Sequence, residues 1–130
     1  MKKLFLLALL SSTMYACSKN KDGGAPASID GYWNGTFTIE GRTGNFDMAV
    51  VLRNNGTARI LYGYPAGDTS RAQYITEDRF TYEDGVVKFQ SRESSYIYSY
   101  QGTANGNVMS GTWGELPSYD DGGTWTMTKK

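Results

Sequence analysis

The sequence predicts an all-β protein, an antiparallel up-and-down β-barrel of about eight strands. Gly and Tyr are frequent, with 16 and 10 of the 130 residues, and this usage favours strands and tight turns over helices. Bulky apolar residues alternate with small or polar ones in the first expected strand, Gly31 to Phe37, and in the last, Gly123 to Met127. If these two strands pair, the sheet closes into a barrel.

The first 16 residues have the features of an export signal. Lys2 and Lys3 form a positive n-region, and residues 4–10 form an apolar segment too short to span a bilayer. Residues 14–17, Met-Tyr-Ala-Cys, resemble a bacterial lipobox, which implies cleavage before Cys17 and lipidation of that cysteine. An ordinary secretory signal is the alternative. The lipobox implies a protein anchored to a membrane of the cell envelope, and we expect the outer membrane, with its face left open.

Three regions are expected along the chain. Residues 1–16 are the signal peptide. Residues 17–29 are the lipidated Cys and a flexible tether, because residues 18–28 are polar and rich in Gly and Pro. Residues 30–130 form the barrel domain, which is long enough for one modest core.

Charge and residue usage exclude several functions. Without Lys2 and Lys3, the 13 basic side chains fall to 11 against 13 acidic ones, a net charge of about −2, and there is no basic block to bind nucleic acid. There is no His, and Cys17 is the only Cys, which excludes disulfides, Cys/His zinc sites and His-based triads within one chain. We therefore expect no cofactor, no metal and no enzymatic activity.

The strands are expected in sequence order, separated by turn signals. They cover residues 31–39, 46–53, 57–64, 73–82, 86–90, 96–103, 108–113 and 123–127. The fourth is the least regular, because Thr-Glu-Asp at residues 76–78 is expected to bulge or turn it. We predict a broken strand there, which leaves eight or nine strands open.

The connections sort into two ends by length. Tight turns are predicted at residues 54–56, 84–85 and 105–106, which contain Asn-Gly or Asp-Gly. Longer connections, at residues 40–44, 65–71, 92–94 and 115–122, fall together at the other end. Both ends of the barrel chain fall beside the tight turns. We expect a closed base near the lipid tether and an open mouth facing away from it.

Gly31-Tyr32-Trp33, at the start of the first strand, resembles the Gly-x-Trp of lipocalins and, more broadly, of calycin-type barrels. The chain from Asp30 to Lys130 is similar to small lipocalin-like lipoproteins of Bacteroidetes. It is shorter than true lipocalins, lacks their Thr-Asp-Tyr motif and leaves no room for their C-terminal helix. The resemblance implies a binding barrel and no more specific activity.

Candidate site residues fall at the two ends. The structural base is expected to contain Gly31, Trp33, Met109 and Met127. At the mouth and in the interior, aromatic rings, hydroxyls and charges provide candidate ligand-binding residues. They are Tyr62, Tyr64, Arg71, Tyr96, Tyr98, Trp113, Tyr119 and Trp125. The competing interpretation is that eight strands leave an interior just filled by side chains.

Two functions fit these features. The first is a membrane-anchored lipoprotein that binds a small, partly apolar or aromatic ligand in the cell envelope. The second is a protein-interaction or inhibitor module that contacts an envelope protein through its mouth loops. An empty aromatic cavity favours the first, whereas a filled core with an exposed aromatic mouth favours the second.

Overall fold

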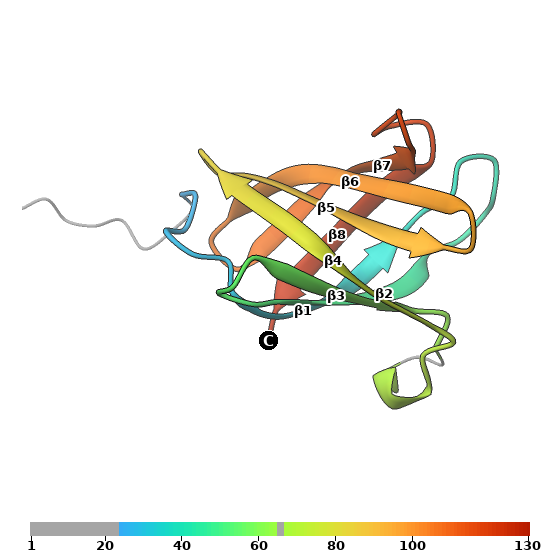
Figure 1. The fold of residues 1–130 in the computed structure, drawn as a ribbon, viewed down its shortest axis with the longest axis horizontal. Helices are drawn as coiled ribbons and strands as arrows, with labels where there is room; N and C mark the ends of the chain where they lie inside the picture. Colours follow the sequence, from blue (N-terminus) through green and yellow to red (C-terminus); the bar gives the residue numbers. More distant parts are fainter. Residues whose placement is uncertain (1–23, 65–66) are drawn as a thin grey trace, which may run out of the picture.

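The structure, a computed structural model, describes residues 24–64 and 67–130. The export signal, Cys17 and the first part of the expected tether lie outside the described residues. Eight antiparallel strands close into a barrel in sequence order (Figure 1), which confirms the expected fold class. The strands are β1 Gly31–Phe37, β2 Phe46–Leu52, β3 Thr57–Tyr62, β4 Tyr74–Glu83, β5 Val86–Glu93, β6 Tyr96–Asn105, β7 Val108–Glu115 and β8 Gly123–Lys129, with a 3-10 turn, η1, at Thr69–Arg71.

The barrel closes through β1, which pairs with β2 on one side and β8 on the other. Trp33 lies opposite Val50 of β2 and Lys129 of β8, and Phe37 lies opposite Phe46 and Trp125. The expected pairing of the first and last strands is confirmed. No strand edge along β1 is left without a partner, which protects the sheet against edge-to-edge association.

The prediction of a broken fourth strand is wrong, because β4 is continuous over ten residues. Residues 74–79 pair with β3, and residues 80–83 pair with β5. Thr76 and Asp78 therefore have backbone partners, Ile60 and Ala58, and need no bulge. Residues 74–79, on the mouth side of Phe80, are not paired with β5, and the two strands diverge there toward the mouth (Figure 1). A side-chain ion pair bridges the divergence, with Arg92 Nε 2.9 Å from Asp78 Oδ2.

The fifth strand is also longer than expected. It runs to Glu93 and not to Gln90, so the expected connection at 92–94 is reduced to Ser94 and Ser95. Ser94 has a φ of 54°, the left-handed conformation that a two-residue hairpin requires. This short hairpin lies at the mouth, and it places Glu93 on the barrel wall.

The base is closed by tight turns and by the segment that precedes β1. Residues 24–30 cross this end: Gly106 N donates to Gly24 O at 3.0 Å, and the Tyr82 hydroxyl donates to Pro26 O at 2.7 Å. Ile29 is 1% exposed and belongs to the core. Gly24 and Pro26 are thus hydrogen-bonded to this end of the barrel and the Ile29 side chain fills it, while Gly24, Ala25, Ala27 and Ser28 stay exposed.

The core occupies the closed half of the barrel. Trp33, Met109 and Met127 lie in it together, as expected for the structural base, and Gly31 starts β1 beside Lys129. A second, smaller cluster lies on the outer face, formed by Ala49, Leu61 and Tyr64. Ala72, next to η1, packs against this outer cluster, so the β3–β4 connection folds back over the barrel wall.

Candidate functional site

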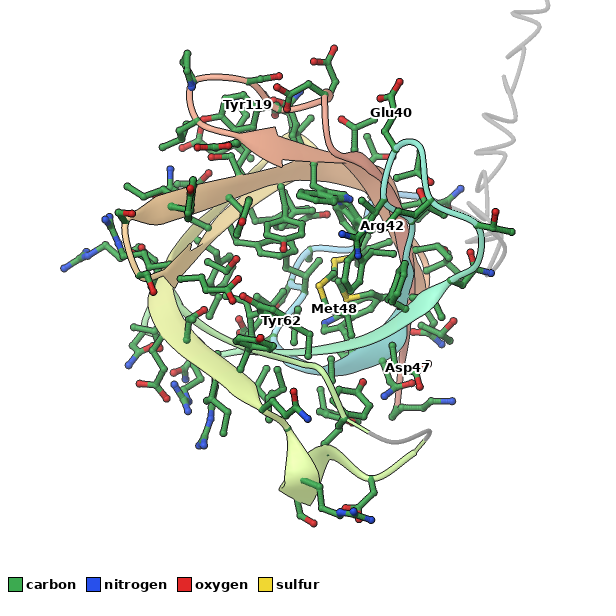
Figure 2. The ribbon with its side chains drawn as sticks, turned by 90° about the vertical axis from the view of Figure 1, so that its right-hand side faces the viewer. Glu40, Arg42, Asp47, Met48, Tyr62 and Tyr119 are labelled. Atoms are coloured by element: carbon green, nitrogen blue, oxygen red, sulfur yellow. The ribbon has the colours of Figure 1, made fainter. Side chains whose placement is uncertain are left out.

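The mouth of the barrel holds a pocket of about 610 Å³ that is open to solvent. Figure 2 looks into this end, with Tyr62 and Met48 inside the ring of strands and Tyr119 and Glu40 outside it. The residues that line the pocket are Phe37, Ile39, Arg42, Phe46, Asp47, Tyr62, Gly63, Tyr64, Tyr74, Glu93, Tyr98, Tyr100 and Trp113. Side chains fill the closed half of the interior, and the mouth half is open. The expected filled interior is therefore found in one half and the expected cavity in the other.

Aromatic rings form the walls, and they contact one another around the pocket. Phe37 lies edge-on to Trp113 and to Tyr62, at centroid distances of 5.9 and 6.4 Å. Trp113 in turn lies edge-on to Tyr98 at 5.7 Å. Tyr62 stacks on Tyr74 at 5.0 Å. Because each ring contacts another, the walls form a continuous aromatic surface around the pocket.

The Trp113 ring is also fixed by a hydrogen bond. Its Nε1 donates to the carbonyl oxygen of Thr38 at 2.7 Å. Thr38 lies just beyond the end of β1, so the bond ties the β1–β2 connection to β7 across β8. One face of Trp113 is backed by Gly122, where a Cβ would lie 2.6 Å from the indole. The ring is held between these neighbours at the edge of the pocket.

Polar groups gather on the wall formed by β3, β5 and β6. The Tyr62 hydroxyl donates to Glu93 Oε2 at 3.3 Å, and Ser91 Oγ lies 3.4 Å from the Tyr100 hydroxyl. Burial raises the pKa of Tyr62, and the Glu93 carboxylate raises it further. Burial likewise raises the pKa of Tyr100 to about 12. These hydroxyls stay protonated at neutral pH and act as hydrogen-bond donors.

Four of the candidate ligand-binding residues line the pocket: Tyr62, Tyr64, Tyr98 and Trp113. Tyr64 lies at the rim and also packs into the outer cluster, where Asn34 Nδ2 donates to its hydroxyl at 3.4 Å. Burial raises its pKa to about 12. Tyr96 is 51% exposed and stacks on Tyr98 with a centroid distance of 6.4 Å, so it lies beside the pocket without lining it.

The other three candidates lie elsewhere. Trp125 lies in the interior, but the expectation that it binds a ligand there is wrong, because it does not line the pocket and packs, 2% exposed, against Phe89 in the core. Arg71 is in η1 and does not line the pocket. Tyr119 lies on the outer wall, where Lys88 Nζ is 5.8 Å from its ring centroid. There it borders a shallower hollow of about 330 Å³ between β4 and β5.

Several lining residues were not among the candidates. Phe37 and Phe46 continue the inward alternation of β1 and β2 to the mouth, so parity alone could have identified them. Glu93 was assigned to a connection, although it follows Val87, Phe89 and Ser91 at every second position. Arg42 has no such signal, because it lies on the β1–β2 connection at the rim (Figure 2).

Comparison of the chain with family models, with curated proteins and with solved structures finds no match. Within the described ranges, no group of three or more His, Cys, Asp or Glu side chains is placed to hold a metal ion. Nor does this part of the chain contain a helix of the length and apolar character needed to cross a membrane. The mouth of the barrel is thus an open pocket with aromatic walls and a few fixed polar groups.

Proposed function

We propose that this chain is a lipid-anchored, lipocalin-like barrel protein of the cell envelope that binds a small, partly apolar ligand in its mouth pocket. The observation that carries the proposal is the pocket itself. Its volume of about 610 Å³ lies within the range typical of small-molecule sites, roughly 300–1,000 Å³. Aromatic walls with a few polar groups are the usual composition of such sites.

The anchoring part of the proposal rests on the sequence, since the lipobox-like residues before Cys17 precede a polar segment. The structure supports the geometry that anchoring would use. Residues 24–30 leave the barrel at its closed base, opposite the mouth (Figure 1). A chain held on a membrane through Cys17 would therefore present its pocket away from the lipid surface. We further propose that the protein comes from a Bacteroidetes cell and is attached to the outer membrane.

We propose binding without catalysis. The pocket hydroxyls of Tyr62 and Tyr100 have raised pKa values, so they are poor general bases near neutral pH. The sequence has no His to activate a nucleophile. Glu93 accepts a hydrogen bond from Tyr62, an arrangement suited to holding a ligand.

A second function is favoured by one observation at the rim. Tyr74, Ile75 and Tyr96 are 41%, 48% and 51% exposed, and all three lie toward the mouth ends of β4 and β6. Exposed aromatic and branched side chains of this kind can contact a protein partner. In that case the barrel is an interaction module of an envelope complex, and the pocket accepts a side chain of the partner.

Native mass spectrometry of the mature chain, purified from its own cells in detergent, tests the first function. We expect a retained small molecule at one copy per chain. Re-addition of that molecule to the emptied protein should shift the indole N–H resonance of Trp113, which lines the pocket, and leave that of Trp33 unchanged. Tyr98→Ala should weaken binding by at least about tenfold, and Tyr119→Ala, on the outer wall, should not.

Variants of the rim distinguish binding of a protein partner from binding of a small molecule. Changes of Tyr96 and Ile75 to Ser should release an envelope protein but keep the small molecule if the rim binds a partner. Resonance shifts confined to the base turns at residues 54–56 and 106–107 would contradict a mouth site altogether.

A further inference from the structure

One carboxylate lies on the inner wall of the pocket. Glu93 occupies the mouth end of β5, on the same inward face as the buried Phe89 and Ser91. Its Oε2 accepts a hydrogen bond from the Tyr62 hydroxyl at 3.3 Å. The backbone register places it opposite Tyr96 of β6. Its position is thus set by strand geometry and by a hydrogen bond from Tyr62 of β3.

This carboxylate has no cationic partner within the described part of the chain. The ion pairs there involve Arg53, Arg59 and Arg92. Arg92, its neighbour in sequence, points to the other face of β5 and pairs with Asp78. A carboxylate in a partly desolvated pocket without a counter-charge is unfavourable, and a bound cation would offset that cost.

Aromatic rings surround the same place. Tyr62 reaches Glu93 directly, and Tyr98 and Tyr100 lie close enough to Glu93 for its charge to raise their pKa values together with burial. Trp113 contacts both Tyr98 and Tyr100, at centroid distances of 5.7 and 6.1 Å. Rings of Trp and Tyr around an acidic group attract organic cations through their negative faces.

The other charged groups near the pocket are consistent with a cationic ligand. Arg42 and Asp47 line its rim, and with Glu93 they give one positive and two negative groups. Arg42 is exposed on the β1–β2 connection, where water screens its charge. Glu115, opposite Tyr98 in the register, is exposed in the same way and does not line the pocket. The half-buried charged groups of the pocket, Asp47 and Glu93, are therefore both negative.

We propose that the ligand of the mouth pocket carries an amine or quaternary ammonium group on an apolar or aromatic body, with Glu93 as the counter-charge and the rings of Tyr62, Tyr98 and Trp113 around the cation. This inference rests on the proposed binding function and narrows the class of ligand. The apolar body lies against Phe37 and Phe46, across the pocket from Glu93. Binding requires no covalent step.

Three probes that share a phenylethyl group test it: 2-phenylethylamine, 2-phenylethanol and 3-phenylpropanoate, which are cationic, neutral and anionic at neutral pH. Each is titrated into the mature chain in detergent, and binding is followed by the indole resonance of Trp113. We expect the amine to bind about tenfold or more tightly than the alcohol, and the carboxylate to bind most weakly. E93Q should remove the preference for the amine over the alcohol.

E83Q is the matched control, because Glu83 lies at the base turn beside Val86 and its loss changes net charge by the same amount. It should keep the full amine preference. The far-UV circular dichroism spectrum and melting temperature of E93Q, compared with those of the wild type, show that this variant is folded. R42Q should tighten the amine a few-fold, since it removes the positive charge at the rim.

The outcomes separate the two proposals. If the probes bind but the amine has no advantage, or the carboxylate binds best, the cation inference is wrong and the binding function stands. An amine preference that survives E93Q also overturns the role of Glu93. If none of the three probes binds, the proposed small-molecule function fails for aromatic ligands, and this inference fails with it.

Discussion

The indole Nε1 of Trp33 donates a hydrogen bond of 2.8 Å to the carbonyl oxygen of Ile29, four residues earlier in the chain. Both side chains are buried, at 0% and 1% exposure. The bond turns the segment before β1 across the base and satisfies a buried N–H that would otherwise be costly. The Gly-x-Trp pattern of the sequence thus has a physical role here, which is to seal the closed end of the barrel.

Trp33→Ala should lower the free energy of unfolding by about 3 to 5 kcal/mol, since it removes a large core side chain and leaves a cavity. Tyr32→Ala, at the next position on the outward face, should cost clearly less. Trp33→Phe keeps most of the volume but leaves Ile29 O without its donor, at a cost of roughly 1 to 3 kcal/mol. Urea unfolding followed by far-UV circular dichroism measures all three. Equal losses for Trp33→Ala and Tyr32→Ala would contradict the register of β1.

Gly102→Ala is expected to be strongly destabilising. Gly102 of β6 lies opposite Gly111 of β7, and a Cβ at Gly102 would lie 2.6 Å from Trp125 Cζ2, and closer still to the carbonyl oxygen of Ser110. Either the backbone pair or the Trp125 ring must move, which costs roughly 1 to 3 kcal/mol or more. Gly24→Ala is the control, because nothing lies within 4 Å of its Cβ position. Thermal unfolding should separate the two variants, and similar melting temperatures would exclude the close approach of β6 and β7.

Alkaline pH should destabilise the fold through its buried tyrosines. Burial raises the pKa of Tyr100 to about 12, whereas tyrosines of the unfolded chain ionise near pH 10. Stability is therefore fully present below about pH 10 and is lost as the pH rises toward 12, by at most about 1.4 kcal/mol per pH unit for this group. Urea unfolding between about pH 9 and about pH 11.5 should show the decline.

Tyr100→Phe provides the control for that decline. The variant lacks the buried hydroxyl that stays protonated in the folded state, so its stability should fall less steeply by close to one proton. Tyr64, whose pKa burial also raises to about 12, still titrates in this variant, so a residual slope is expected. Identical slopes for the wild type and Tyr100→Phe would show that Tyr100 ionises as freely in the folded chain as in the unfolded one.

The turns and the core parity of this fold could be predicted from the sequence because both depend on local rules. Asp84 and Gly85 adopt φ values of 51° and 78°, which Asp-Gly tolerates and most residues do not. Alternation placed Trp33, Met109 and Met127 inside for the same reason, since every second side chain faces one way. Those elements needed no knowledge of the neighbouring strands.

The height of a residue along the barrel axis could not be predicted in this way. Trp125 faces inward as its parity requires, but its height depends on the register between β8 and its neighbours, where it lies opposite Phe37 and Gly111. Parity fixes the face of a side chain and leaves the strand shear undetermined. Trp125 therefore fills the core, and Trp113, on the adjacent strand, lines the pocket.

The side of the barrel to which a connection folds also could not be predicted from the sequence pattern. Residues 116–122 connect β7 to β8 at the mouth end, yet they fold over the outer wall and place the Tyr119 ring beside Lys88. The β3–β4 connection folds back in the same way, with Ala72 against the outer cluster. Side chains on such connections follow tertiary contacts, so Tyr119 and Arg71 were grouped with the mouth on sequence position alone.

A lipid anchor at Cys17 should fix the orientation of the barrel on a membrane. Seven residue steps separate Cys17 from Gly24, the first described residue, and a fully extended chain covers at most about 25 Å over that length. If Cys17 is acylated, the base turns must stay within roughly that distance of the lipid surface. Strands of six to ten residues place the mouth roughly 15 to 25 Å farther away.

Two labelled variants measure this orientation in vesicles that carry a lipid-attached quencher. A fluorophore at Asn55, in the base turn before β3, should be quenched more strongly than one at Asp121, in the β7–β8 connection at the mouth. Cys17→Ala should move the chain from the membrane fraction to the soluble or precursor fraction, because the proposed anchor is then absent. A Cys17→Ala chain that stays membrane-bound in mature form would refute the lipoprotein assignment. Stronger quenching at Asp121 than at Asn55 would refute the orientation alone, since it would place the pocket against the lipid surface.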